Sequence, residues 1–450
     1  MLTQINEAVS AFLWGPPMLA AFLGVGLLLT LRARGWQLTH AHIWLRETLL
    51  AAFRDKAVRQ GGADGSISQF QALSAALAAC MGTGNIVGVA TAICAGGPGA
   101  VFWMWASALL GMMTCAAENI LGIRFRYRDA RGEWMGGAMV YLERGLGMKK
   151  TAKIFCIFLL LASFGVGNMT QTNSIAAAVQ EAFGIAPAAT GIAVAALAAL
   201  VILGGIRRIA AVAEKLIPAL SLVFLLVSLA VILKNAAALP AVLRMICREA
   251  FSLHAAAGFG MAKALRFGVA RGVFSNEAGL GSSAIIHAAA AVERPAVQGM
   301  WGMLEVFLDT VVMCSITALT ILCSGVWQSG GTLNGAQLSA AAFATLLGRG
   351  GSVFVCVSVA LFAFATLLGW SYYGKRGAQY LWGERAGTPY LLLYIGGAFL
   401  GCVTSPDAVW TLSDSFNALM AVPNLLALTL LSGQAVRELQ KEPARRQMRR

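Results

Sequence analysis

The sequence predicts an all-α polytopic membrane protein with about eleven transmembrane helices. The chain of 450 residues is 58% hydrophobic and only 12% charged, with a mean hydropathy of +0.72. A soluble domain is about one quarter charged, so this chain lacks the polar surface that contact with water on all sides requires. Its apolar residues are gathered into runs of about the length that crosses a bilayer. Its 50 glycines are typical of helices that pack closely in lipid.

A transmembrane helix needs about 20 mainly apolar residues. The predicted spans are 12–32, 70–95, 99–123, 152–180, 188–206, 212–234, 257–291 (interrupted), 298–325, 351–374, 388–404 and 409–432. The segment 35–68 is polar and is predicted to hold an interfacial helix. One face of that helix would carry its apolar residues, which are Trp36, Ile43, Trp44, Leu45, Leu49, Leu50 and Phe53.

The net charge of +14 raises the question of nucleic acid, but the basic residues form short clusters between apolar runs. If the N-terminus lies outside and the spans alternate, 27 of the 34 Lys and Arg residues lie inside. This bias predicts a multi-pass protein of a bacterial plasma (inner) membrane, with its N-terminus outside and its C-terminus cytoplasmic. The nine cysteines show no metal-binding spacing and are interpreted as small buried side chains.

The eleven spans divide into one extra helix and two groups of five. Because a five-helix repeat reverses its orientation in the membrane, two such groups would form an inverted pair. The predicted parts are an N-terminal helix with the interfacial helix (1–68), two five-helix repeats (69–235 and 236–432) and a basic cytoplasmic tail (433–450). The two spans most interrupted by glycine, 70–95 and 257–291, then open the two repeats, where such folds place their binding site.

The first interruption runs from Cys80 to Gly88, with Gly82, Thr83, Gly84 and Asn85 at its centre. Each glycine weakens a helix by about 1 kcal/mol relative to alanine. An unwound segment here exposes carbonyls that bind a cation and amides that bind a carboxylate. The alternative is a close helix crossing through small residues. The pairing with a second interruption favours the binding site.

The second interruption contains Ser275, Asn276, Glu277 and Gly279. A carboxylate within a span is costly, so Glu277 is either a ligand or a structural group that holds the unwound backbone. Glu118 and Asp309 also lie within spans, and bracing of neighbouring helices is favoured for both. All three carboxylates are structural or proton-carrying groups, and the sequence leaves both interpretations open.

Two other spans carry candidate polar groups. Asn168 and Gln171 share a helical face, and Gln171 is favoured as a substrate contact over a contact between helices. Thr366 offers a hydroxyl and Trp370 lies one turn later. By position alone, a hydroxyl bonded within its own helix and an interfacial anchor are the favoured interpretations of these two residues.

The residues show no enzyme constellation. The four histidines, His40, His42, His254 and His287, are scattered, and no metalloprotease, hydrolase or P-loop motif occurs. The chain is therefore not expected to be an enzyme or to hold a cofactor. A channel would need a continuous polar pore, whereas the polar residues cluster near two breaks. A non-transporting sensor would need an added signalling domain, for which 433–450 is too short.

Several long motifs in one order resemble the alanine or glycine:cation symporter family from about residue 65 to 430. They are GTGNIVGVATAICAGGPGAVFWMWASALLGMMTCAAENILGIRFR (82–126), GNMTQTNSIA (167–176), FSNEAGLGS (274–282), QGMWGMLEVFLDTVVMCSITALTIL (298–322) and FAFATLLGWSYYG (362–374). The resemblance implies the leucine-transporter type of inverted-repeat fold. It also implies uptake of a small neutral amino acid, alanine or glycine, driven by sodium, or by protons in some members. The expected partners are the amino acid, the cation and lipid, with no nucleic acid and a functional monomer.

The resemblance also implies the site. Thr83, Gly84 and Asn85, with the break at Ser275, Asn276 and Gly279, would hold the carboxylate and ammonium of the amino acid. Three residues would form the pocket wall: Gln171, Phe274 and Trp370. A sodium ion, the only metal expected, would lie between three residues: Ala78, Met81 and Thr366.

The chain departs from the family pattern at several positions. Ala365 precedes Thr366 where relatives usually carry a serine, which removes one sodium oxygen and favours the alternative of proton coupling. Ala138 and Val140 replace a usual proline and tyrosine, and residues 283–286 replace a proline-containing stretch. The last change is expected to affect the inner gate or the substrate range.

Overall fold

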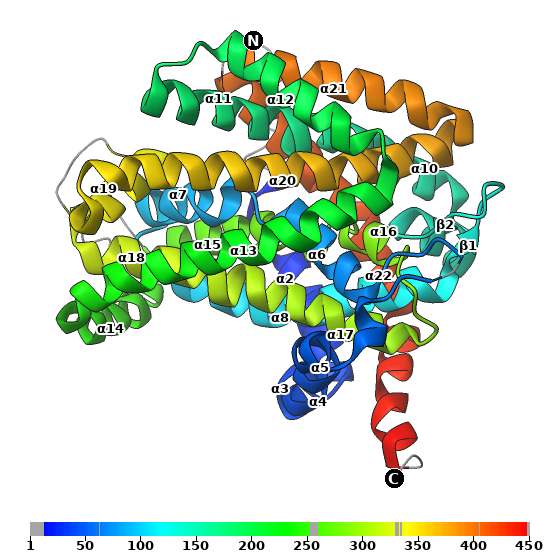
Figure 1. The fold of residues 1–450 in the computed structure, drawn as a ribbon. Coiled ribbons are helices and arrows are strands. Elements are labelled where there is room, and N and C mark those ends of the chain that lie inside the picture. The colour runs from blue at the N-terminus through cyan, green and yellow to red at the C-terminus, as the bar shows by residue number, and fades with distance from the viewer. Residues whose placement is uncertain are drawn as a thin grey trace.

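The protein is a bundle of long helices, most of which run side by side (Figure 1). The computed structural model describes residues 13–62, 64–252, 260–328, 333, 335–404 and 406–447. His254 and the first residue of the predicted span 12–32 lie outside the described residues.

The N-terminal half is helical apart from one short hairpin. Its elements are α2 (Pro16–Arg32), α3 (Trp36–Thr39), α4 (Ala41–Leu45), η1 (Arg46–Leu50), α5 (Ala51–Arg54), η2 (Lys56–Arg59), α6 (Gln69–Cys80), η3 (Thr83–Asn85), α7 (Val87–Gly96), α8 (Gly99–Phe125), β1 (Tyr127–Arg128), β2 (Trp134–Met135), α9 (Ala138–Val140), η4 (Tyr141–Gly145), α10 (Lys149–Phe164), η5 (Gly165–Met169), α11 (Thr170–Phe183), α12 (Pro187–Ile202) and α13 (Gly205–Lys234).

The described C-terminal half is helical. Its elements are η6 (Ala236–Ala238), α14 (Leu239–Ala250), α15 (Met261–Asn276), α16 (Ser283–His287), α17 (Pro295–Val306), η8 (Phe307–Cys314), α18 (Ser315–Ser324), η9 (Val326–Gln328), α19 (Ala336–Leu347), α20 (Arg349–Trp382), η10 (Glu384–Ala386), α21 (Gly387–Val403) and α22 (Pro406–Gln447). Of the helices marked η, η1, η4, η5 and η8 are π-helices and the others are 3₁₀-helices.

All eleven predicted spans are helical in the described residues. Seven of them form helices that are long and apolar enough to cross a membrane: Gly99–Phe125, Lys149–Phe183, Gly205–Lys234, Pro295–Ser324, Arg349–Trp382, Glu384–Val403 and Ser415–Glu442. The remaining four are the shorter helices α2 and α12 and the two interrupted spans. The prediction of an all-α polytopic fold with two broken helices is therefore confirmed.

The first broken helix consists of α6 and α7. Ser68 and Gln71 form a capping box that starts α6, each side chain bonding the backbone of the other residue. The helix stops at Cys80, and the backbone leaves helical geometry at Gly82 before the short turn η3. A side chain at Gly82 would place its Cβ 2.5 Å from the Thr366 hydroxyl, so close packing requires glycine there.

The second broken helix consists of α15 and α16. Glu277 ends α15 with a φ of 55°, a left-handed conformation that is uncommon for residues other than glycine. Gly279 and Gly281 follow with φ values of 97° and 80°. The chain resumes helical geometry at Ser283. The interruption between α15 and α16 therefore has a defined backbone shape that glycine makes accessible.

The interfacial segment 35–68 forms the short helices α3, α4, η1 and α5, which stand at the edge of the bundle (Figure 1). Trp36, Ile43 and Trp44 are buried in the protein, as expected for one apolar face. Leu50 and Phe53 are exposed instead, with exposed fractions of 43% and 76%.

The last helix is longer than predicted. The helix α22 continues beyond the predicted end of the span at 432 and runs to Gln447, through most of the predicted tail 433–450. Arg294 bonds Glu442 at 2.8 Å and Arg124 bonds Glu438 at 2.5 Å, so this extension is tied to the bundle. The helices α14 and α19 lie in segments that the sequence prediction left without helices.

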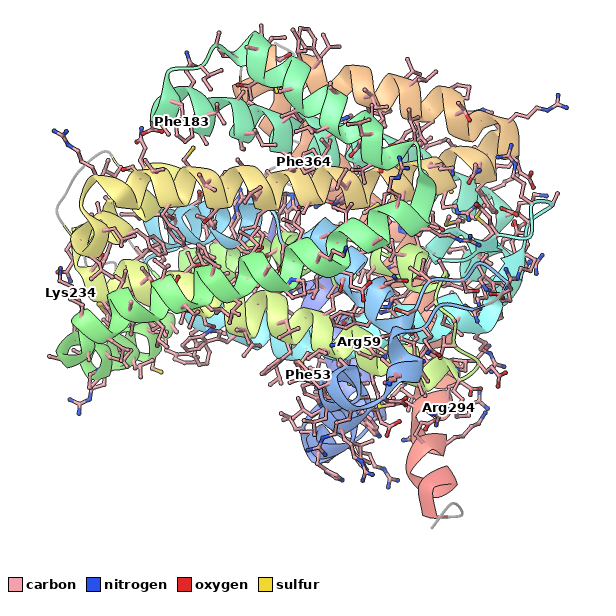
Figure 2. The ribbon with its side chains drawn as sticks, viewed as in Figure 1. Phe53, Arg59, Phe183, Lys234, Arg294 and Phe364 are labelled. Atoms are coloured by element: carbon pink, nitrogen blue, oxygen red, sulfur yellow. The ribbon has the colours of Figure 1, made fainter. Side chains whose placement is uncertain are left out.

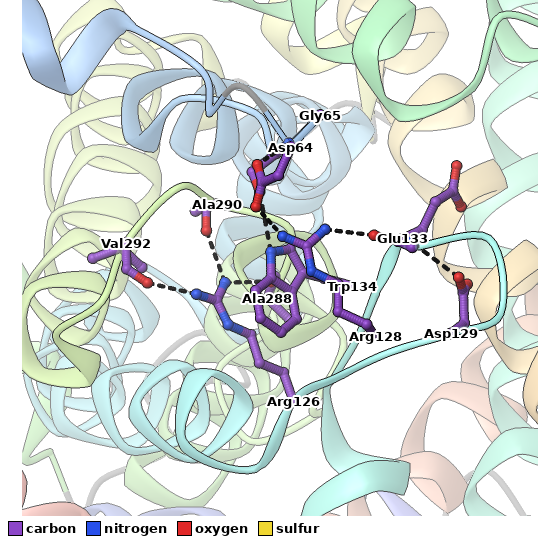
Figure 3. A network of polar contacts seen from close by, with 12 residues as sticks. Asp64, Gly65, Arg126, Arg128, Asp129, Glu133, Trp134, Ala288, Ala290 and Val292 are labelled. Atoms are coloured by element: carbon purple, nitrogen blue, oxygen red, sulfur yellow. Dashed lines mark hydrogen bonds and ion pairs between the residues drawn. The ribbon is translucent and has the colours of Figure 1, made fainter.

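The β1–β2 hairpin joins one end of the bundle to the second broken helix (Figure 3). Arg126 donates to the carbonyls of Ala288, Ala290 and Val292, just after α16. Arg128 forms an ion pair with Asp64. Hydrogen bonds from Ser66 and the nearby Arg128 guanidinium lower the pKa of Asp64 to about 2.

Candidate substrate and ion site

The two breaks meet deep inside the bundle, and Asp309 connects them. Asn85 in the first break donates to Asp309 Oδ1 at 2.8 Å and to the Asp309 carbonyl at 3.1 Å. Ser275, in the last turn of α15 just before the second break, donates to Asp309 Oδ2 at 2.8 Å. All three side chains are buried. Asp309 lies in the π-helix η8, whose wider turn is often found at functional sites.

A second carboxylate, Glu118, holds the backbone of the second break. Its Oε1 accepts from the amides of Gly279 and Gly281, both at 3.0 Å, and from Asn424 at 2.6 Å. Asn424 also donates to the Gly279 carbonyl at 2.9 Å. Glu118 therefore bonds unwound backbone, whereas the carboxylate of Asp309 bonds the side chains of Asn85 and Ser275.

The third carboxylate, Glu277, bonds the protein on both oxygens. Trp370 Nε1 donates to Oε1 at 2.8 Å, and the Ser282 hydroxyl donates to Oε2 at 2.5 Å. Trp370 is buried beneath Gly167, where an added Cβ would collide with the indole. These contacts make Glu277 a link between the second break and α20.

A small cavity opens beside the first break. It has a volume of about 260 Å³ and is lined by Thr83, Gly84, Val87, Gly88, Thr91, Arg271, Phe274 and Gly335. Pockets for drug-sized ligands are about 300–1,000 Å³, so this cavity suits a smaller solute. The Thr83 hydroxyl is buried and has no hydrogen-bond partner among the described residues. It is therefore a polar group that a solute can bind.

The structure separates the predicted substrate residues into two sets. Thr83, Gly84 and Phe274 line the cavity. The others are not in its lining: Asn85, Gln171, Ser275, Asn276, Gly279 and Trp370. They bond protein groups instead.

The contacts of this second set show how it supports the breaks. Gln171 Oε1 accepts from the Thr83 amide at 3.4 Å. Asn276 donates to the Thr310 hydroxyl at 3.1 Å and accepts from the Ala278 amide at 3.0 Å. Gly279 faces Phe22, and a Cβ added at Gly279 would lie 2.8 Å from the Phe22 ring. Gly279 therefore lies on the side of the break that packs against α2.

The residues predicted to bind a cation lie together. The Thr366 hydroxyl donates to the Ala78 carbonyl at 3.0 Å, across from α20 to the end of α6. Gly82 lies against the same hydroxyl, so Thr366 touches both sides of the place where α6 unwinds. Met81 contacts Ser221 of α13 through its sulfur at 3.7 Å.

A larger apolar cleft reaches this cation region from another direction. Its volume is about 770 Å³, and its lining includes Phe53 and Arg59 together with Met81 and Ser221. In Figure 2, Phe53 and Arg59 lie at the lower edge of the bundle, away from its left end, where Lys234 is labelled. The cleft therefore approaches the α6 side of the first break, whereas the small cavity lies on the α7 side.

Sequence reasoning missed three residues of this region. Arg271 lines the small cavity beside Phe274, with its guanidinium 5.5 Å from the ring centre. Its signal in the sequence was an Arg within a predicted span, which by itself indicates a functional site. Asn424 and Ser221 carried no signal, because single polar residues within apolar helices are common and only the fold shows what they touch.

A membrane bundle in which two broken helices meet at a braced central site has the architecture of a secondary transporter. Solved structures of a manganese transporter from Eremococcus coleocola share this architecture. One of them, in complex with an aromatic bis-isothiourea compound, matches with a TM-score of 0.52 and 14% identity over 82% of this chain and 84% of that chain. This likeness concerns the fold alone.

The family model described as the sodium:alanine symporter family matches residues 1–449, and the chain belongs to this family. The sodium/alanine symporter AgcS of Methanococcus maripaludis is 42% identical over 97% of this chain and 96% of its own length. An uncharacterized transporter of Haemophilus influenzae is 43% identical over 95% and 93%. A Bacillus subtilis protein named as a probable sodium/glutamine symporter, GlnT, is 35% identical over 96% and 89%.

The prediction of the family from sequence motifs is therefore confirmed. The chain is a transporter and not an enzyme, and its family supports symport of an amino acid with a cation.

Proposed function

We propose that this protein imports a small neutral amino acid, alanine or glycine, together with sodium by alternating access. The observation that carries the proposal is the meeting of a small cavity and a candidate cation region at one unwound helix. The relative AgcS, named as a sodium/alanine symporter, supports alanine as the substrate, whereas GlnT, named for glutamine, supports a range of substrates within the family.

In this proposal the amino acid lies in the cavity beside η3. Its carboxylate is bound by the Thr83 hydroxyl and the Gly84 amide, with the Arg271 guanidinium at the cavity wall. Its ammonium faces Ser275 and Asn276 at the end of α15, where the second break follows. Phe274 limits the space for the side chain, which favours alanine or glycine. Asn85, Gln171, Asn276, Gly279 and Trp370 then act by holding the two breaks in shape.

Sodium would bind where α6 ends, to the carbonyls of Ala78 and Met81 and to the Thr366 hydroxyl. The hydroxyl already lies 3.0 Å from the Ala78 carbonyl, so these oxygens can share one ion after a small adjustment. Hard cations prefer several oxygen ligands. Ala365 supplies no side-chain oxygen, and this departure is the specific observation that favours proton coupling as the second candidate.

The orientation and internal symmetry belong to the same proposal. The excess of basic residues predicts an outside N-terminus and a cytoplasmic C-terminus in a bacterial plasma membrane. Residues 69–235 and 236–432 would form the inverted repeats, each opening with its broken helix. The apolar cleft that begins at Phe53 would then lie on the cytoplasmic side, and the protein would act as a monomer without a cofactor.

The test is uptake of radiolabelled alanine into proteoliposomes under an inward sodium gradient or an inward proton gradient without sodium. Accumulation with sodium alone is expected. Accumulation with protons alone would overturn sodium coupling and support the second candidate. Failure to accumulate any small amino acid under either gradient would contradict the proposed function as a whole.

A further inference from the structure

A buried polar cluster lies at the end of the second broken helix, outside the cavity and the cation region. Ser283 and His287 lie one turn apart on α16 and both reach Glu305 on α17. The Ser283 hydroxyl donates to Glu305 Oε2 at 2.7 Å, and His287 Nε2 lies 3.0 Å from the same oxygen. The side chains of the histidine and the glutamate are 0% and 1% exposed. Such a buried pair is costly to maintain unless its charges are matched.

The hydrogen bonds around the imidazole fit two protonation states. Gln298 Nε2 lies within hydrogen-bond distance of His287 Nδ1. If the amide donates to Nδ1, the ring is neutral and its Nε2 hydrogen bonds Glu305, which leaves a net charge of −1 on the pair. If the Gln298 amide is reversed, its oxygen accepts from a protonated Nδ1 and the pair is neutral overall. The same heavy atoms therefore serve the pair with and without an added proton.

Two further features of the cluster are consistent with a changing proton. Gln298 Oε1 and Glu305 Oε1 are buried and have no hydrogen-bond partner among the described residues. A reversal of the Gln298 amide would give its oxygen a donor when the imidazole is charged. The burial cost of the net negative charge would then be removed at the same time.

Titratable groups face the cluster from each neighbouring element. From α8, Cys115 lies 3.6 Å from Glu305 Oε2, and Glu118 lies within electrostatic reach. Glu277 at the second break, Asp309 in η8, Cys80 in α6 and Tyr373 in α20 also interact with Glu305 electrostatically. On the positive side, Arg126 bonds the carbonyls of Ala288 and Ala290, directly after His287 (Figure 3).

The cluster is connected to the first broken helix through the backbone. The Ile67 amide donates to the Ala289 carbonyl at 3.1 Å, and the Ala291 amide donates to the Ile67 carbonyl at 2.8 Å. Ile67 immediately precedes Ser68, the cap of α6. A change in how α16 is held therefore reaches the start of the helix that contains the cation region.

We propose that His287 and Glu305 form a proton-binding site whose occupied state fixes α16 to α17. Loss of the proton leaves a buried net charge, which weakens this contact and frees the inner half of the second broken helix. The site shares no residue with the candidate sodium region, so it makes transport depend on pH whichever cation drives it. This inference goes beyond the proposed function and does not depend on the identity of the amino acid.

The direct test observes the imidazole itself. The chain has four histidines, so the variant His40→Gln/His42→Gln/His254→Gln retains only His287. With ¹⁵N-labelled histidine, the purified protein should show this imidazole gaining a proton as the pH is lowered. Glu305→Gln in this background should lower the proton affinity by about tenfold or more, because it removes the paired negative charge. A single neutral tautomer across the whole range would overturn the proposal.

The functional test compares pH profiles of amino-acid uptake at a fixed cation gradient. The wild-type rate should change by about fivefold or more between about pH 6 and about pH 8.5, and His287→Gln should reduce this change to about twofold or less. His42→Gln, at an exposed position, is the matched control and should keep the wild-type profile. A wild-type profile in His287→Gln would overturn the link to transport. If no amino acid is taken up while the imidazole still titrates, the proposed function fails and the proton site stands.

Discussion

At the scale of single residues, the central contact is the one between Asn85 and Asp309. The amide of Asn85 donates twice to Asp309, which also accepts from Ser275. One carboxylate thereby fixes the separation of the two breaks. A buried carboxylate that loses such a donor has an unsatisfied hydrogen-bond acceptor, which is energetically costly.

We expect Asn85→Leu to weaken binding of alanine by about tenfold or more, because it removes both hydrogen bonds that Asn85 donates to Asp309 and fills the break with an apolar side chain. The measurement is equilibrium binding to purified protein. Thr317→Val is the control, since the Thr317 hydroxyl bonds only the Met313 carbonyl of its own turn among the contacts the structure shows. Unchanged affinity in Asn85→Leu would remove the first break from the proposed site.

The sequence motifs named residues that lie around both breaks, but not the directions in which their side chains point. Thr83, Gly84 and Phe274 line the cavity, and the Thr366 hydroxyl donates to the Ala78 carbonyl. Gly279 and Trp370 face other helices, because the side of a broken helix that turns toward a cavity depends on its neighbours. The His287–Glu305 pair was missed for the same reason, since 18 residues separate its members in sequence.

At the scale of helices, each break is held open by side chains from a continuous neighbour. Glu118 of α8 binds two amides that would otherwise be unpaired in the interruption between α15 and α16. Asp309 of η8 binds side chains instead, since it accepts from Asn85 in the first break and from Ser275 at the end of α15. An unwound backbone inside a membrane protein requires such partners, because water does not reach it.

We therefore expect Glu118→Ala to lower the free energy of unfolding by about 3 kcal/mol or more. Three buried donors, Gly279 N, Gly281 N and Asn424 Nδ2, lose their common acceptor, and each unpaired group costs about 1–3 kcal/mol. Thermal unfolding in detergent measures the effect. Glu181→Ala, at an exposed position, should leave the unfolding temperature nearly unchanged. Equal stability of the two variants would show that Glu118 does not brace the break.

The helices that lie in the membrane were predictable because long apolar runs identify them. All eleven predicted spans are helical, with ends that differ by several residues. The helices α14 and α19 were missed, since each has only 12 residues and lies between spans. The end of α22 was missed because its basic residues were interpreted as a tail, whereas ion pairs with Arg124 and Arg294 hold it against the bundle.

At the scale of the whole molecule, the distribution of basic residues predicts the orientation. Most Lys and Arg residues lie in the segments assigned to the cytoplasm, where the positive-inside bias places them. In this orientation α14 lies outside the cell. Cys247 on this helix is exposed, whereas Cys94 is partly buried and the other seven cysteines are buried.

We expect a membrane-impermeant maleimide to label Cys247 in intact cells that express the Cys94→Ser variant. Cys247→Ser in the same background should abolish most of the labelling, because the remaining thiols are buried. Labelling that appears only after the cells are permeabilised would reverse the proposed orientation.

The central claim is that substrate and sodium bind at one unwound segment, so that each strengthens the binding of the other. The most direct measurement is the affinity of purified protein for alanine without sodium and at saturating sodium. We predict that saturating sodium raises the alanine affinity of the wild-type protein by about tenfold or more. The increase should be clearly smaller in Thr366→Val, which lacks the hydroxyl that reaches Ala78. Ser371→Ala should show the wild-type increase, because among the contacts the structure shows the Ser371 hydroxyl bonds only its own helix. An alanine affinity that does not change with sodium in the wild-type protein would contradict the claim.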